Sequence, residues 1–142
     1  MKNNQQSFGF LVADVSRLMR RAFARRLGEG SITLNEARAL VYIARNQGLR
    51  QIDLADLLEI QAIQLARLID RLAELKLVER RAVPADRRAY CIHLLPAAAK
   101  VLASFEKVAT AIHKEALDGL SGEQIGVLTN ALEHISTNLN RR

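Results

Sequence analysis

The sequence predicts a mainly α-helical protein with one small β-hairpin, an α+β class in which long helices occupy both ends of the chain. Apolar residues recur at steps of three and four over residues 8–27 and 98–139, which is the period of an amphipathic helix. Between these segments, residues 78–94 combine a turn signal with the alternation that is typical of strands. The 142 residues suffice for one domain, or for one domain with an appendage.

The N-terminal segment is predicted to form a helix that ends at Gly28 and Gly30. Its apolar stripe consists of Phe8, Leu11, Val12, Val15, Leu18, Met19, Ala22, Phe23 and Leu27. Five arginines lie between these residues, so residues 1–31 carry a net charge of +4.

The middle of the chain predicts three shorter helices. Thr33 and Glu36 have the spacing of a capping box, in which each side chain accepts a hydrogen bond from a free amide of the first turn. The helix that follows is stopped at Gly48. Two further apolar-periodic segments are joined by the tight link Glu59–Gln61, which is typical of a helix-turn-helix.

The predicted hairpin follows directly. Its first strand spans residues 78–83, and Pro84-Ala85-Asp86 is a turn signal. In the second strand, apolar Tyr90, Ile92 and Leu94 alternate with Ala89, Cys91 and His93. A hairpin after a helix-turn-helix predicts a winged helix-turn-helix.

Two helices complete the chain. The first runs from Pro96 to about Leu117 and is closed by Gly119, and the second begins at a capping box of Ser121 and Gln124. Their apolar stripes exceed what one small winged-helix body can cover, which indicates an interface. We therefore expect three parts: an N-terminal dimerisation helix (1–31), a winged helix-turn-helix DNA-binding domain (32–95) and a C-terminal helical hairpin for dimerisation (96–142).

Composition narrows the class of partner. A formal net charge of +6 suits a polyanion such as DNA, RNA or an anionic membrane surface, although solubility alone is an equally good explanation. Aromatic residues make up 4%, which disfavours stacking platforms for single-stranded bases. The single cysteine, Cys91, and the absence of a secretory or membrane-spanning segment predict a cytoplasmic protein that does not engage a membrane.

The fourth helix is the candidate reader of duplex DNA, because a helix fits the major groove and presents its first turn to base edges. Gln61 stands just before that turn, the first-turn residues Ala62, Ile63 and Gln64 are expected to face the groove, and Gln64 has the groups for a bidentate contact to adenine. Arg67 and Arg71 share a face within reach of phosphate or guanine. The alternative is that these arginines are solvated or paired with Asp70 and Glu74 at helical spacing.

The hairpin adds a second candidate contact. Arg87 and Arg88 lie at its tip, where an arginine can enter the narrow minor groove. Asp86 precedes them and is expected to orient a wing guanidinium by a charge-assisted bond. By itself this motif reads as a charged turn; after a helix-turn-helix it favours a wing that binds DNA.

With these motifs the chain resembles the MarR family of regulators, and it is most similar to the SlyA-like branch. The residues that carry the resemblance are Gln51-Ile52-Asp53-Leu54-Ala55, Leu68-Ile69-Asp70-Arg71-Leu72, Asp86-Arg87-Arg88 and the segment EALDGLSGEQIGVLTNAL. The resemblance implies a homodimer that binds double-stranded DNA at a pseudo-palindromic operator and acts as a repressor or a dual regulator of transcription. It also implies release by a small aromatic, carboxylate-type ligand, for which Arg17, Leu18 and Arg21 are the candidate residues; the alternative is that the two arginines form only a solvated face of the helix.

The sequence departs from the family pattern at several positions. Lys76 stands where the family usually has glycine, Ala98 stands where a glycine is often found, and Leu94-Leu95 replaces Leu-Thr. Gln61 replaces a Ser or Thr cap, and Ile63 and Gln64 replace small hydroxyl residues. These changes keep open a second hypothesis, a winged-helix protein-interaction module without sequence-specific DNA binding.

Nothing in the sequence predicts an enzyme. We find no nucleophile with an adjacent base and no glycine-rich phosphate loop. The three histidines, His93, His113 and His134, lack metal-ligand spacing, so we expect neither a metal nor a cofactor.

Overall fold

The computed structural model describes residues 7–28 and 32–141, except for the side chain of Arg87. Within these residues the chain forms six helices and three strands and divides into two compact units, residues 1–109 and 110–142, which are described separately below. The mainly α-helical class with a small sheet is as predicted. No described helix is both long and apolar enough to cross a membrane.

Helices α1 and α2 begin at polar caps. Helix α1 (Phe8–Leu27) starts after Ser7, whose hydroxyl accepts a hydrogen bond from the Phe10 N–H, and ends at Gly28 as predicted. Helix α2 (Leu34–Arg45) starts at the predicted capping box, with the Glu36 N–H donating to Thr33 Oγ1 and the Thr33 N–H donating to Glu36 Oε1.

Helices α3 (Gln51–Leu58) and α4 (Ala62–Glu74) form the helix-turn-helix. The turn between them is tight because Glu59 adopts a left-handed conformation, with φ of 55°, at the end of α3. Gln61 is the N-terminal cap of α4. Lys76, just after α4, also has a left-handed backbone, with φ of 59°, a conformation that glycine adopts more readily than a residue with a side chain.

The sheet contains one strand more than predicted. Strands β2 (Val78–Val83) and β3 (Asp86–Leu94) form the expected antiparallel hairpin, with Arg80 opposite Ile92. A two-residue strand, β1 (Leu49–Arg50), pairs with the other edge of β3 and gives the order β1-β3-β2. A strand this short carries no alternation, so sequence periodicity could not reveal it. We call the β2–β3 hairpin, residues 78–94, the wing.

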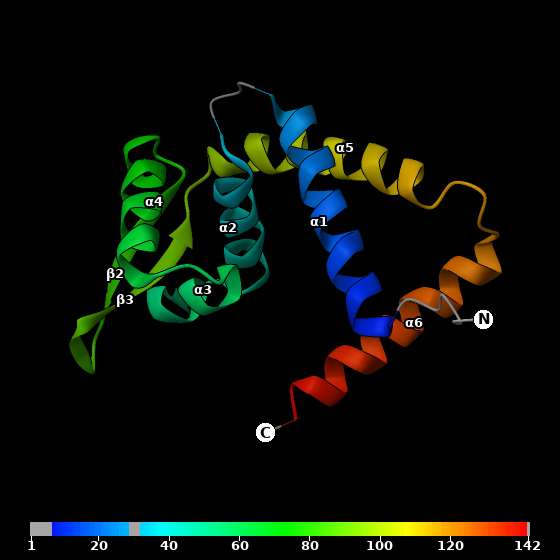
Figure 1. Ribbon diagram of the computed structural model, residues 1–142. Helices are drawn as coiled ribbons and strands as arrows, with labels where there is room; N and C mark the ends of the chain where they lie inside the picture. Colours follow the sequence, from blue (N-terminus) through cyan, green and yellow to red (C-terminus); the bar gives the residue numbers. More distant parts are fainter. Residues whose placement is uncertain (1–6, 29–31, 142) are drawn as a thin grey trace. The chain divides into compact units, whose positions relative to one another are not determined.

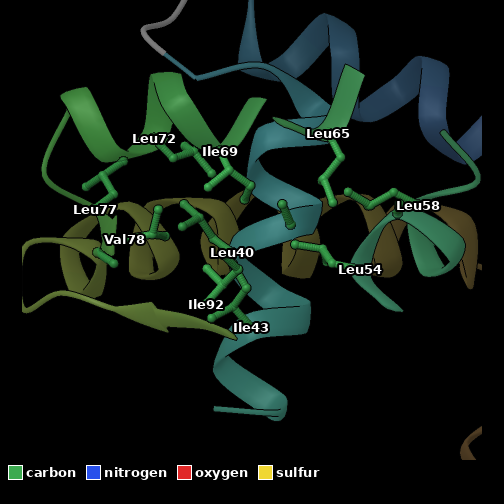
Figure 2. Packing of buried hydrophobic residues seen from close by; sticks show 13 residues of the cluster. Leu40, Ile43, Leu54, Leu58, Leu65, Ile69, Leu72, Leu77, Val78 and Ile92 are labelled. Atoms are coloured by element: carbon green, nitrogen blue, oxygen red, sulfur yellow. The ribbon is translucent and has the colours of Figure 1, made fainter. Parts of the chain in front are cut away.

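One hydrophobic core joins the helix-turn-helix to the wing. Leucine and isoleucine side chains of α2, α3 and α4 converge on side chains from the start of β2 and the end of β3 (Figure 2). The fully buried members include Leu40, Ile43, Leu54, Leu65, Ile69, Leu72, Val78 and Ile92. Figure 1 shows α2, α3, α4 and the wing gathered into one body, from which the turn of the hairpin projects.

The C-terminal helices are α5 (Ala98–Ala116) and α6 (Gly122–Leu139). Helix α5 begins two residues later than predicted and starts within the first unit, where Ala98 is fully buried. Helix α6 belongs to the second unit and begins at the predicted Ser121–Gln124 capping box. None of the residues of α6 is buried.

Candidate nucleic-acid interface

The outward side of α4 is set by the burial of its opposite side. Leu65, Ile69 and Leu72 are fully buried in the core. A helix turns by about 100° per residue, so the residues that point most directly outward lie two positions from these anchors. Among them we call Ile63, Arg67, Asp70 and Glu74 the outer line of α4, and all four are exposed; Arg71, also two positions from an anchor, contacts Glu36 of α2 instead.

The first turn of α4 is tied to its own cap. Gln61, Ala62 and Gln64 are all exposed at this turn, where the sequence places them as DNA contacts. The Gln61 N–H donates to Gln64 Oε1 at 3.2 Å. A bidentate contact from Gln64 to adenine would use the same amide oxygen, so such a contact competes with the cap.

Arg80 braces the wing against the helix-turn-helix. Its Nε donates to Gln51 Oε1 at 2.9 Å, and its Nη2 donates to the backbone carbonyl of Ala66 at 3.0 Å. Its Nη1 lies 2.7 Å from Asp70 Oδ1. The side chain is only 25% exposed, so this one guanidinium links β2 to both helices in a partly desolvated place, where such bonds are stronger than in water.

Arg71 is paired with a buried acid. Its Nε lies 2.8 Å from Glu36 Oε2, and this oxygen accepts no well-aligned hydrogen bond from the described residues, so the contact is an ion pair. As one alternative, the sequence suggested that Asp70 and Arg71 pair with residues along α4. Each also contacts another element: Asp70 contacts Arg80 of β2, and Arg71 contacts Glu36 of α2. The Arg71 side chain is still 54% exposed.

The tip of the wing is ordered through its backbone. Asp86 Oδ1 accepts a hydrogen bond from the backbone N–H of Arg88 at 3.0 Å, and the Arg88 side chain is exposed. Arg87 belongs to β3, but its predicted role lies outside the described side chains. Asp86 thus holds the strand that carries both arginines at the point where it leaves the turn.

A cleft of about 380 Å³ separates the wing from the helix-turn-helix. Its walls come from the junction of β1 with α3, the start of α4 and the first half of β3. Arg50, Gln51, Ala62, Asp86 and Arg88 are among the residues that line it. The start of α4 and the tip of the wing lie on its two sides.

The residues predicted to hold a ligand lie on the exposed side of α1. Arg17 is paired with Asp14 at 2.7 Å, and Leu18 and Arg21 are exposed. A separate cleft of about 300 Å³ lies between the end of α1, the start of α2 and α5. It is lined by Arg26, Leu27, Ile32, Ala37, Val101, Ser104, Phe105 and Val108.

Sequence reasoning missed Arg80, Glu36 and this second cleft as parts of the site. For Arg80 a signal was present, because it follows buried Val78 by two residues and strand alternation places both on the inner side. No local signal connects Glu36 with Arg71, which are 35 positions apart.

The fold and this arrangement define the class of protein: the chain is a winged helix-turn-helix protein with helical extensions. A model of the MarR family matches residues 31–89, which span the helix-turn-helix and most of the wing. The structure of the transcriptional regulator PA3341 is 33% identical, with a TM-score of 0.79, and the match covers 96% of this chain and all of that one. The chain belongs to the MarR family of transcriptional regulators.

Two further comparisons agree. Wild-type MarR from E. coli, in its apo form, has a TM-score of 0.81 at 22% identity over 94% of this chain and 98% of that one, a likeness that concerns the fold alone. A putative transcriptional regulatory protein for the hcr operon of Thauera aromatica is 31% identical over 96 residues, or 68% of this chain. The match spans 58% of the length of that curated relative.

Proposed function

We propose that the chain is a DNA-binding transcriptional repressor of the MarR type that acts on genomic DNA in the cytoplasm as a homodimer. Residues 32–95 would read the duplex, and residues 1–31 and 96–142 would supply the dimer contacts. The SlyA-like branch stays a prediction, supported by the segment EALDGLSGEQIGVLTNAL. The relatives named above are described as transcriptional regulators, which favours regulation over catalysis.

One observation carries this proposal: an exposed helix face and an arginine-bearing wing are held in one body by Arg80. The first turn of α4, with Gln61, Ala62 and Gln64, would enter the major groove. Arg67 would bind phosphate, and Arg71 would do so from its position beside Glu36. Arg87 and Arg88 would enter the minor groove, with Asp86 fixing the backbone from which they project.

Exposed apolar side chains support the homodimer. On α1 they are Phe8, Phe10, Leu11, Val12, Val15 and Leu18, and on α6 they are Val127, Leu128, Leu132 and Leu139. A helix with no buried residue, such as α6, draws little stability from its own chain, because helices in water depend on packing. A second copy of the chain would cover these surfaces.

Release by a small aromatic carboxylate is part of the proposal. The cleft beside α1 combines a guanidinium at Arg26 with apolar walls from Val101 and Phe105, which suits a flat anion better than the exposed side of α1 does. Leu18, Arg17 and Arg21 would then line the approach to the ligand or remain in solvent.

The test is capture of genomic fragments. Purified full-length protein is mixed with sheared genomic DNA from its source, and the retained fragments are sequenced. We expect pseudo-palindromic sites with half-sites about 10 base pairs apart. With ~6–10 phosphate contacts, affinity should fall by ~10³–10⁵ between 50 and 200 mM salt. Equal affinity for every duplex, or none, would instead favour the protein-interaction module.

A further inference from the structure

Ile63 is a large apolar side chain in an unusual place. It is the second residue of α4 and is 59% exposed. Two residues along a helix turn it by about 200°, so Ile63 points almost directly away from buried Leu65 and the core. It is the first member of the outer line of α4.

At the start of α4, the residues on either side of Ile63 lie on other sides of the helix. Ala62 lies on the side of the wing cleft, and Gln64 lies on the side of α2, where its amide oxygen is held by the Gln61 N–H. Arg67, the next member of the outer line, follows one turn later. The foremost side chain of α4 is therefore apolar and has no hydrogen-bonding group.

The major groove offers such a side chain one partner. Among the edges of the four base pairs in that groove, only thymine carries an apolar group, its 5-methyl; the other features are hydrogen-bond donors and acceptors. An isoleucine placed against a donor or acceptor would desolvate it without replacing the lost water. Against a methyl group it buries apolar surface on both sides.

We propose that Ile63 is a specificity-determining residue that reads the 5-methyl group of one thymine in each half-site. The inference rests on the proposed function, since it requires α4 in the major groove. It adds a contact that depends on one methyl group and that is separate from hydrogen-bond readout by Gln64.

The experiment uses an operator obtained from the genomic capture. Each thymine of the half-site is replaced in turn by deoxyuridine, which keeps the base pairing and removes only the methyl group. Binding of the full-length protein is measured by fluorescence anisotropy at fixed salt. Loss of one buried methyl group should weaken binding about fourfold, and loss at the symmetric position in both half-sites about 15-fold. Only one thymine position per half-site should show this sensitivity.

Ile63→Ala separates this contact from a general weakening. The variant should bind the thymine operator more weakly than the parent does. The ratio of its affinity for the thymine operator to its affinity for the deoxyuridine operator should fall toward one. The matched control is Leu75→Ala, because Leu75 is also exposed but lies at the opposite end of α4, about 18 Å along the axis. In this control, the ratio of affinities for the thymine and deoxyuridine operators should equal that of the parent protein. Circular dichroism melts check that both variants are folded.

The outcomes distinguish the two proposals. An operator that is bound with equal affinity with and without every methyl group overturns the role of Ile63 and leaves the proposed function standing. The same holds if Ile63→Ala keeps the full deoxyuridine penalty. If the protein selects no duplex at all, the proposed function fails and the role of Ile63 fails with it.

Discussion

The Nε atom of Arg71 on α4 lies 2.8 Å from Oε2 of Glu36 on α2, and Glu36 is only 3% exposed. The other oxygen of the same carboxylate accepts the Thr33 N–H that opens α2. The buried carboxylate of Glu36 thus caps α2 and also pairs with Arg71 of α4. Loss of the Arg71 partner would leave a desolvated carboxylate without its counter-charge, which costs more than breaking a surface ion pair.

Glu36→Ala removes both interactions and should lower the free energy of unfolding by about 2 kcal/mol. Glu36→Gln keeps an oxygen for the Thr33 N–H and loses only the charge. Because Arg71 is half exposed and can be solvated, this change should cost about 1 kcal/mol. Urea denaturation measures both values. Glu74→Gln, on the exposed outer line of α4, is the control, and a Glu36→Gln variant as stable as that control would contradict this account.

Arg80→Lys tests the brace between wing and helices. Lysine keeps the charge but has no planar fork, so it cannot hold Gln51, Ala66 and Asp70 together. We expect a loss of about 1–2 kcal/mol in stability and weaker binding to every duplex. Arg81→Lys is the control, since Arg81 is exposed and pairs with Glu79, two positions before it on the same strand. Equal melting temperatures for the two variants would show that the brace contributes nothing.

Arg88→Ala should weaken binding to the operator by ~1–3 kcal/mol, with a larger loss for A·T-rich flanks than for G·C-rich flanks. The reason is that a narrow A·T minor groove attracts arginine most strongly. Arg67→Ala should weaken both kinds of site by similar factors, since phosphate carries no sequence information. Anisotropy titrations against both flanks at fixed salt give the comparison. If Arg87→Ala and Arg88→Ala both bind like the parent, the wing does not read DNA.

Lys76→Gly should stabilise the protein by about 0.5 kcal/mol. A left-handed backbone costs a side-chain-bearing residue about 1–2 kcal/mol, whereas glycine costs ~0.5–1 kcal/mol through the entropy of the unfolded chain. The difference favours glycine at this φ of 59°. Thermal melts measure the change. The control is Lys100→Gly within α5, where glycine should instead destabilise by about 1 kcal/mol.

Deletion of residues 121–142 should give monomers or aggregates, because it removes the exposed apolar side chains of α6. The point variant Leu132→Asp should have the same effect with less change to the chain, since it places a charge among those side chains. Asn130→Asp adds the same charge at an exposed polar position of α6 and should leave the dimer intact. Sedimentation at micromolar concentration reports the result, and a full-length chain that is already monomeric would end the dimer proposal.

The bounds of the helices could be predicted closely, because the spacing of apolar residues and the capping residues are local properties of the sequence. Thr33 with Glu36, and Ser121 with Gln124, fixed the starts of α2 and α6. The wing was equally visible in the alternation that ends at Leu94. These signals lie within a few residues of one another, so they need no knowledge of the rest of the chain.

The electrostatic contacts could not be predicted in the same way. Helical spacing offered Asp70 partners on its own helix as one alternative, but Asp70 contacts Arg80, which comes from a strand. Glu36 and Arg71 meet only because α2 and α4 pack on a shared core. Strand β1 forms by pairing with the free edge of β3. Its two residues are too few to show an alternating pattern in the sequence.

That short strand has a consequence for the spacing of bound DNA. Arg50 ends β1, Gln51 begins α3 and accepts a hydrogen bond from Arg80 at its amide oxygen, and β3 runs between β1 and β2. The base of the wing is therefore held on both edges, by pairing of β3 with β1 and by the contacts of Arg80 on β2 with α3 and α4. If the wing and α4 occupy adjacent grooves, these attachments restrict the separation between those two contacts. An extra base pair between them must then be absorbed by bending or twisting of the duplex, whose cost depends on its sequence.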